Sequence, residues 1–139
     1  MSDGNGQPVL TGEQTFKVGE PTTVMGPAPA GTFSAVFEDD GDTGYFYGLD
    51  NAKGEQPIVD ALHIYNAHEV TDRHIPSTAQ IVWSGSGQQV ALFINDYPHA
   101  VFDFEHRRGY CRTGFPPPVS AFSPEGHEWS DEALEFLKE

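Results

Sequence analysis

Two sets of residues in this chain combine side chains whose types could do chemistry. The first is an acidic run, in which carboxylates crowd one short stretch of sequence: Glu38, Asp39, Asp40 and Asp42. Calcium prefers clustered oxygens, but an EF-hand loop needs a glutamate at its twelfth position, and Leu49 and Asp50 do not supply it. The run is more typical of a solvated hairpin tip, whose carboxylates could also form part of a docking patch for a basic partner.

The second set includes the single cysteine and could line a pocket for a small ligand: His63, Tyr65, His99, Cys111 and Arg112. The Arg112 guanidinium could bind a carboxylate or phosphate at two points. Neighbouring arginines could also make the Cys111 thiol reactive by favouring its thiolate. The alternatives are that Cys111 is a small buried hydrophobe, that His63 is a hydrogen-bonded core residue and that Arg112 balances nearby acids. We assign no catalytic residue.

Metal binding is a weaker hypothesis. His99, Asp103 and Glu105 alternate along one predicted strand and share a face that could bind a divalent metal or pair an acid with a base. Side chains two positions apart on a strand are about 7 Å apart, so one strand seldom chelates a metal alone. His63 or His74 would have to lie alongside, and the sequence has no His-Glu-x-x-His motif. We predict no metal site and no cofactor, while metal binding by His63, His99 and Asp103 stays open.

Alternating apolar residues predict most of the elements that would position these groups. Residues 32–38 and 45–49 predict one hairpin, and residues 80–83 and 88–95 predict a second. Residues 99–105 alternate cleanly between apolar and polar side chains, as a strand with one buried face does. These segments together favour antiparallel pairing.

Three further segments complete the predicted elements. Residues 58–65 are apolar on both faces, which is typical of a central or doubly covered strand. Residues 109–115 predict a last short strand before a run of prolines stops the pairing. Ser130 is a suitable N-cap for a helix of about nine residues, and a helix that short needs packing to hold it.

The predicted fold class is mainly β, in the α+β sense. We expect about six to seven antiparallel strands, in a single curled sheet or a small β-sandwich, with one short C-terminal helix. Residues 1–31 are rich in glycine and proline and predict a partly irregular segment with at most one short edge strand near Phe16. Residues 32–139 then form a single domain.

Composition restricts the classes of function. Seven Lys and Arg oppose 21 Asp and Glu among 139 residues, which gives a net charge of −14 and disfavours nucleic-acid binding. No apolar stretch approaches the length of a membrane-spanning helix, so we expect no membrane partner. One cysteine allows no intrachain disulfide, which favours a reduced, cytoplasmic location.

Four blocks of sequence carry a resemblance to a known family. They lie at residues 36–47, 60–66, 97–104 and 109–112 and include the runs FEDDGDTGYFY, DALHIYN and YPHAVFDF. The chain resembles a small bacterial family catalogued as a domain of unknown function, over roughly residues 33–118. The resemblance implies a bacterial cytosolic protein and carries no established activity, substrate or catalytic residue.

Three hypotheses of function follow. The first is a non-enzymatic acidic module that binds a basic protein partner, with an inhibitor- or immunity-like protein as one concrete form. The second is a small-ligand-binding or enzymatic domain whose pocket is lined by the histidine, arginine and cysteine set. The third is a homo-oligomer that associates through an exposed edge strand. The strongly acidic composition favours the first.

Overall fold

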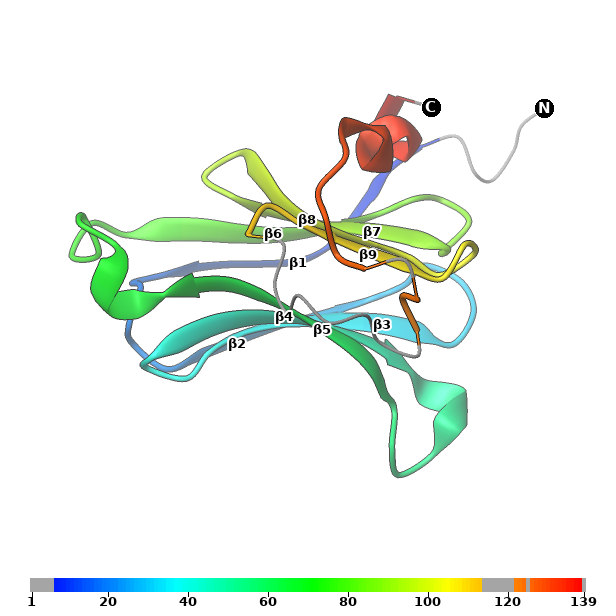
Figure 1. Ribbon diagram of the computed structural model, residues 1–139, viewed down its shortest axis with the longest axis horizontal. Helices are drawn as coiled ribbons and strands as arrows, with labels where there is room; N and C mark the ends of the chain where they lie inside the picture. Colours follow the sequence, from blue (N-terminus) through cyan, green and yellow to red (C-terminus); the bar gives the residue numbers. More distant parts are fainter. Residues whose placement is uncertain (1–6, 114–121, 125, 139) are drawn as a thin grey trace.

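The computed structural model describes residues 7–113, 122–124 and 126–138, and over these ranges the chain forms a two-layered β-sandwich (Figure 1). One sheet has five strands in the order β1-β6-β7-β8-β9, and the other has four in the order β2-β3-β4-β5. All the pairings between named strands are antiparallel. The strands are β1 (Val9–Phe16), β2 (Thr22–Pro27), β3 (Phe33–Asp39), β4 (Thr43–Asp50), β5 (Ile58–Asn66), β6 (Ser77–Trp83), β7 (Gln89–Ile94), β8 (Tyr97–Asp103) and β9 (Arg108–Cys111).

The mainly β prediction is confirmed, in its sandwich form, but the number of strands was too low. The described residues contain nine strands, two of which, β1 and β2, lie in the glycine- and proline-rich segment before residue 32. Strand β1 pairs with β6, whereas β2 pairs with β3. These two strands therefore belong to opposite sheets, although they follow one another in the chain. The part of the irregular-segment prediction that concerns residues 1–6 falls outside the described residues.

Close packing explains why this segment can form strands despite its glycines. A Cβ atom on Gly12 would lie 2.5 Å from the carbonyl oxygen of Met25, and one on Gly26 would lie 2.6 Å from Cγ2 of Ile81. These two glycines therefore allow backbones to approach closely instead of breaking the strands. Pro27 ends an edge strand, where its missing N–H removes little from the ladder.

The two hairpins predicted from alternation are confirmed as β3–β4 and β6–β7. The strand predicted over residues 58–65 exists as β5. Of the two alternatives given for it, a central strand or one covered on both faces, the first was wrong. It forms an edge of the four-stranded sheet. A register shift pairs Tyr65 with Gly44 and His63 with Tyr45, so the residue between them, Ile64, bulges and is also buried. The buried residues of β5 alternate as Asp60, Leu62 and Ile64, and the partly buried Val59 and Tyr65 of the other parity also pack against the core. Next to a bulge, inward packing from both parities resembles the pattern of a doubly buried strand.

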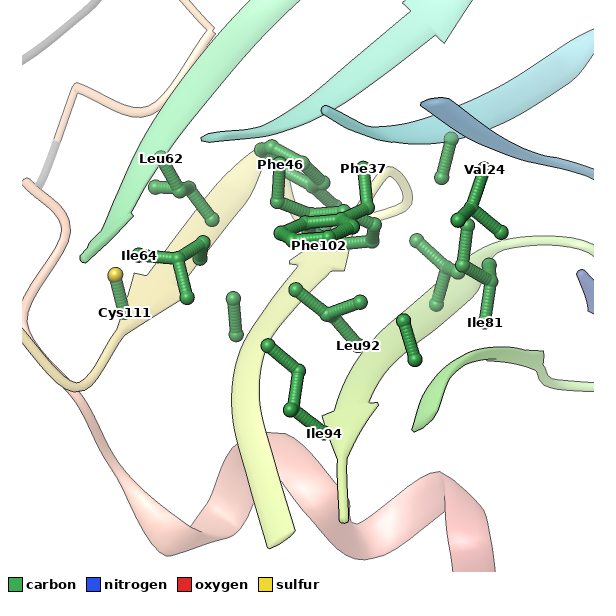
Figure 2. Packing of buried hydrophobic residues seen from close by; sticks show 14 of the residues in the cluster. Val24, Phe37, Phe46, Leu62, Ile64, Ile81, Leu92, Ile94, Phe102 and Cys111 are labelled. Carbon is green, nitrogen blue, oxygen red and sulfur yellow. The ribbon is translucent and has the colours of Figure 1, made fainter. Parts of the chain in front are cut away.

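The core lies between the two sheets and is rich in aromatic rings. Phe46 of β4 and Phe102 of β8 stack across the interface at 5.2 Å between ring centroids. Figure 2 shows these rings beside Phe37, with Leu92 nearby. Each of these side chains is fully buried, and burial of a large apolar side chain contributes about 1.5–3 kcal/mol. Trp83 is also fully buried, and its indole N–H donates to the Gly26 carbonyl at 2.9 Å.

A 3-10 helix, η3 (Asp131–Lys138), lies over the outer face of the five-stranded sheet (Figure 1). The Ser130 hydroxyl accepts a hydrogen bond from the Glu132 N–H at 3.2 Å, as expected of an N-cap. Ala133 and Phe136 are buried against Ala91 and Val101 of the sheet. Packing thus holds the short helix, as its length requires.

Two further features bear on the sequence predictions. The last predicted strand, over residues 109–115, is observed as β9 (Arg108–Cys111), and residues 114 and 115 fall outside the described part. Within the described ranges, no helix has the length and apolar character needed to cross a membrane.

Candidate functional site

The outer face of the four-stranded sheet is the most distinctive surface of the protein, and we call it the tyrosine face. Its side chains alternate with buried ones along each strand, since Phe37 and Phe46 point inward and are fully buried. The strand register aligns the outward residues in two rows. The rows are Met25, Val36, Tyr47 and Ala61, and next to them Thr23, Glu38, Tyr45 and His63.

Aromatic rings dominate the middle of the tyrosine face. The rings of Tyr45 and Tyr47 stack with centroids 5.9 Å apart and an interplanar angle of 17°. The His63 ring lies 5.2 Å from Tyr45, and its Nε2 donates to the Asn66 side-chain oxygen at 3.0 Å. At the edge strand, Met25 is 65% exposed. No element that the structure describes covers this face (Figure 1).

The electrostatic character of the tyrosine face is negative. Strands β2 to β5 contain no lysine or arginine. Burial of the ring and the charge of Glu38 raise the pKa of Tyr47, with smaller contributions from Tyr45 and Asp40. The influence of Glu38 and Asp40 on a phenol in the middle of the sheet means that the face disfavours further negative charge.

The acidic run covers the end of β3 and the turn to β4, but one of its members is not at the surface. Asp39 is only 1% exposed. Its carboxylate accepts hydrogen bonds from the Tyr65 hydroxyl at 2.6 Å, from the Gly19 N–H at 2.7 Å and from the Gly41 N–H at 2.8 Å. The prediction that Asp39 belongs to a docking patch is therefore corrected: this carboxylate joins the β3–β4 turn to β5 and to the β1–β2 loop.

The other three acids remain accessible. Asp40 is exposed and accepts hydrogen bonds from the N–H groups of Asp42 and Thr43, both at 2.9 Å. These bonds lower the pKa of Asp40, with the bond from Thr43 as the largest cause. Asp42 is exposed, and Glu38 is half-buried on the tyrosine face. The turn thus presents carboxylates at the end of the same sheet.

The five residues predicted to line a ligand pocket lie in different environments. The His63 side chain is on the tyrosine face, whereas Tyr65 turns inward and donates to Asp39. Cys111 is fully buried at one edge of the core, near Ile64 (Figure 2). Its thiol donates to the main-chain carbonyl oxygen of His63 at 3.1 Å.

The remaining two pocket residues lie on the outer side of the five-stranded sheet. The Arg112 guanidinium stacks on the rings of Trp129 and Tyr97, at 3.9 and 4.7 Å from their centroids, and its Nε donates to the Pro98 carbonyl. His99 contacts Tyr97 edge-on at 5.2 Å. Burial and the nearby Arg112 charge lower the pKa of His99 to about 4. Arg112 therefore packs against aromatic rings, and His99 is a neutral imidazole at pH 7.

The structure also groups acids and a histidine that the sequence had not combined. Ligand atoms of Asp103, Glu105 and His106 all lie within 4.8 Å of one another. The His106 ring bonds to the Asp103 carboxylate at 2.8 Å, which raises the pKa of His106, and the Gln89 amide donates to both carboxylates. In the sequence, the two acids group with His99, because the three residues alternate along the predicted strand. In the structure the chain turns after β8, and this turn places His106 beside the two carboxylates.

A second pair was missed altogether because its members are 67 positions apart. His127 Nε2 lies 2.9 Å from the Asp60 carboxylate, and the two side chains are only 1% and 4% exposed. The pair joins β5 to the segment before η3, and the His127 carbonyl accepts from the Cys111 N–H at 3.0 Å. Buried polar groups require partners, so the contact is a structural link between distant segments. No local pattern in the sequence signals it.

The fold and its surfaces define a small antiparallel β-sandwich with one outer face covered by a helix and the other face open. The chain belongs to a family described as "Uncharacterized protein conserved in bacteria" (DUF2251), whose model matches residues 16–138. This confirms the family resemblance noted from the sequence and extends it on both sides of residues 33–118.

One curated relative is a Haemophilus influenzae protein described as "Uncharacterized protein". It is 49% identical over 86 residues, which make up 62% of this chain and 53% of the relative. The matched part therefore spans about half of that protein's length. No solved structure matches this chain.

Proposed function

We propose that this protein is a non-enzymatic binding module whose tyrosine face docks a cationic segment of a basic protein partner. The observation that carries the proposal is the open outer face of the four-stranded sheet. Stacked tyrosines and Glu38 meet there without a lysine or arginine in any of the four strands. An inhibitor- or immunity-like role is one form that this binding could take.

Tyrosine suits such a surface because it combines a large apolar ring with a polar tip and few rotatable bonds. It is enriched at protein interfaces for that reason. The faces of Tyr45 and Tyr47 would receive lysine or arginine side chains, and a cation over an aromatic ring contributes about 0.5–2 kcal/mol, depending on its desolvation. Glu38 sits opposite Tyr45 in the strand register and would pair with the same cation.

Long-range attraction supports the same partner chemistry. The net charge of −14 would steer a basic protein toward this module and slow the approach of acidic ones. The exposed carboxylates of Asp40 and Asp42 extend the negative surface beyond the end of the sheet. Asp39 takes no part, because its carboxylate is buried and fully engaged in hydrogen bonds.

The experiment that tests the proposal is affinity capture from bacterial lysate at low salt, with a pair of charge-matched variants. Glu38→Lys changes the tyrosine face, and Glu13→Lys makes the same charge change at an exposed position on β1 of the other sheet. We expect a basic protein to be retained by the wild type and by Glu13→Lys and to be lost with Glu38→Lys. The purified pair should then dissociate as salt is raised.

Two results would count against the proposal. Equal retention by Glu38→Lys and by the wild type would mean that the tyrosine face is not the docking site. Equal losses with Glu38→Lys and Glu13→Lys would mean that net charge alone drives the capture. Sedimentation of the purified protein would also distinguish a second copy of the chain as the occupant, since a dimer that Glu38→Lys dissociates would place the contact between copies.

A further inference from the structure

A cavity of about 320 Å³ lies on the outer side of the five-stranded sheet, beside η3 and away from the tyrosine face. The turn between β6 and β7, the turn after β8 and η3 all contribute to its lining. Both turns lie at the right-hand end of the upper sheet in Figure 1, and the Phe104 N–H there donates to the Gln88 carbonyl at 2.8 Å. Three segments that are distant in sequence therefore meet around one cavity.

The charges around this cavity are negative. Arg108 lies opposite Asp103 in the strand register, and its guanidinium carbon lies over the Tyr110 ring, 4.9 Å from the centroid. Among the residues that the structure describes, no lysine or arginine lines the cavity itself. Four carboxylates line it, and they belong to Asp103, Glu105, Glu132 and Glu135. The cavity therefore selects a cation.

An imidazole beside two of these carboxylates completes a set of metal ligands. His106 also lines the cavity, and one ligand atom each of Asp103, Glu105 and His106 lies within 4.8 Å of the other two. Bonds of about 2.0–2.2 Å place opposite ligands of an ion about 4 Å apart, so side-chain movements of less than about 1 Å would bring all three atoms to one ion.

Hydrogen bonds hold the three groups in this arrangement. His106 Nδ1 lies 2.8 Å from Asp103 Oδ2, and the Gln89 amide donates to Asp103 at 3.2 Å and to Glu105 at 3.3 Å. The main chain of Gln89 is fixed in turn, because its N–H donates to the Ser84 hydroxyl at 3.1 Å. Partners of this kind orient metal ligands in proteins. A bound ion would replace the proton between His106 and Asp103.

The mixture of nitrogen and oxygen ligands restricts the kind of ion. Calcium and magnesium prefer oxygen ligands alone, whereas imidazole suits zinc and its neighbours among the transition metals. Zinc accepts imidazole and carboxylate ligands together, and three protein ligands leave a position for water. The His106 side chain is 71% exposed, so an ion would reach it directly from solvent.

We propose that Asp103, Glu105 and His106 bind a divalent transition-metal ion. Glu132 and Glu135 of η3 line the same cavity and add to its negative potential, although Glu135 shares its charge with Lys138, whose Nζ lies 3.4 Å away. The ion site is separate from the tyrosine face. Its occupation is independent of whether that face docks a basic partner.

The test is isothermal titration calorimetry of the chain without an added histidine tag, with Zn²⁺ as the probe. We expect one Zn²⁺ to bind per chain. A tenfold excess of Mg²⁺ should change the affinity for Zn²⁺ by less than about twofold, because Mg²⁺ gains little from an imidazole ligand. The proposal is overturned if Zn²⁺ at about 1 mM does not bind. It is also overturned if Mg²⁺ displaces Zn²⁺, since the net negative charge alone would then attract both ions.

Matched variants locate the ion. His106→Gln and Asp103→Asn should each weaken Zn²⁺ binding at least about tenfold, since loss of even an outer partner of a metal ligand costs that much. His74→Gln and Asp96→Asn make the same changes at other exposed positions and should leave the affinity within about twofold. Equal affinities for His106→Gln and the wild type would overturn the proposal, as would equal losses for His106→Gln and His74→Gln.

An NMR titration separates this site from the protein's fold and from the tyrosine face. Because the His106 ring is mostly exposed, His106→Gln should melt like the wild type in the absence of metal. On addition of Zn²⁺ to the wild type, the ring signals of His106 should shift while those of His63 stay unchanged. Glu38→Lys, on the tyrosine face, should bind Zn²⁺ as the wild type does. A shift at His63 without one at His106 would place the ion elsewhere and overturn the proposal.

Discussion

The two outer faces of the sandwich differ, although both are built from strands of alternating side chains. On the five-stranded sheet, Ala91 and Val101 are fully buried because η3 lays Ala133 and Phe136 over them. On the four-stranded sheet, the corresponding outward positions carry Tyr45, Tyr47 and His63, and no described element lies over them.

This difference shows that the types of side chain on an outer face indicate whether another segment of the same chain packs on that face. Alanine and valine have no polar atoms, so they gain only when another apolar group removes them from water. Tyrosine and histidine keep a polar tip in water while their rings pack on neighbours. A face of the second kind is stable when open and remains able to bind a partner.

The most direct test of this comparison is to remove the packing of η3 on the five-stranded sheet. We expect Phe136→Ala to lower the free energy of unfolding by about 3 kcal/mol, because it empties the contact between η3 and the sheet. Glu135→Ala, on the exposed side of the same helix, should change it by less than about 0.5 kcal/mol. Urea unfolding measures both, and a loss below about 1 kcal/mol for Phe136→Ala would mean that the helix adds little.

The covered side should also make stability depend on pH through His99. Its pKa is about 4 in the folded protein, against an ordinary value of 6.5, so the unfolded chain binds a proton over this interval that the folded protein does not. Stability should therefore fall as the pH is lowered from 6.5 toward 4, by on the order of 2 kcal/mol given the partial exposure of the ring.

The measurement compares urea unfolding of the wild type and of His99→Gln at pH 7.5 and pH 4.5. Because the variant lacks the titrating ring, it should lose less stability on acidification than the wild type does. Identical losses in the two proteins would show that His99 titrates normally and that its surroundings are open to water.

On the open face the same kind of truncation should cost far less. Tyr47→Ala removes a half-buried ring that stacks on Tyr45 of the same strand, and it should lower the free energy of unfolding by no more than about 1 kcal/mol. Chemical denaturation beside Phe136→Ala gives the contrast directly. A loss above about 2 kcal/mol would remove the distinction between the two faces, since Tyr47 would then be a core residue in its own right.

The smallest effect concerns the charge beside the tyrosines. Burial and Glu38 together raise the pKa of Tyr47, so Glu38→Gln should move that pKa back toward its ordinary value. An NMR titration of the tyrosine rings follows the change. Glu13→Gln, which lies on the other sheet, should leave Tyr47 where it is, and an equal shift in the two variants would assign the effect to net charge.

Much of the fold was predictable from local pattern. The alternation of Phe33, Ala35 and Phe37 has one interpretation as a strand with a buried face, and the structure pairs that strand with β4 as expected. The short edge strand predicted near Phe16 is observed as the longer β1, and β2 was missed, because Gly12 and Gly26 resemble breakers in sequence. Their role depends on backbones from other strands that come within contact distance, which sequence spacing does not reveal.

The candidate sites were less predictable, for a related reason. The predicted hairpin tip holds Asp40 and Asp42, whereas Glu38 and Asp39 lie in β3, and nothing in the neighbouring sequence indicated that Asp39 would contact Tyr65 and Gly19. A cavity at one end of the sandwich joins Phe33 to Phe104 and Phe122, which are far apart along the chain. A pocket between segments is a property of how sheets stack, and residue types alone do not specify it.

Residue order by itself determined the hairpins, the short capped helix and the strongly negative charge, because turn chemistry, side-chain period and ionisation act over a few residues. Only the tertiary structure decided which strands became edges, which carboxylate was buried and which outer face received the helix. Those outcomes depend on contacts such as that of Asp60 with His127, whose energy exists only after distant segments have been brought together.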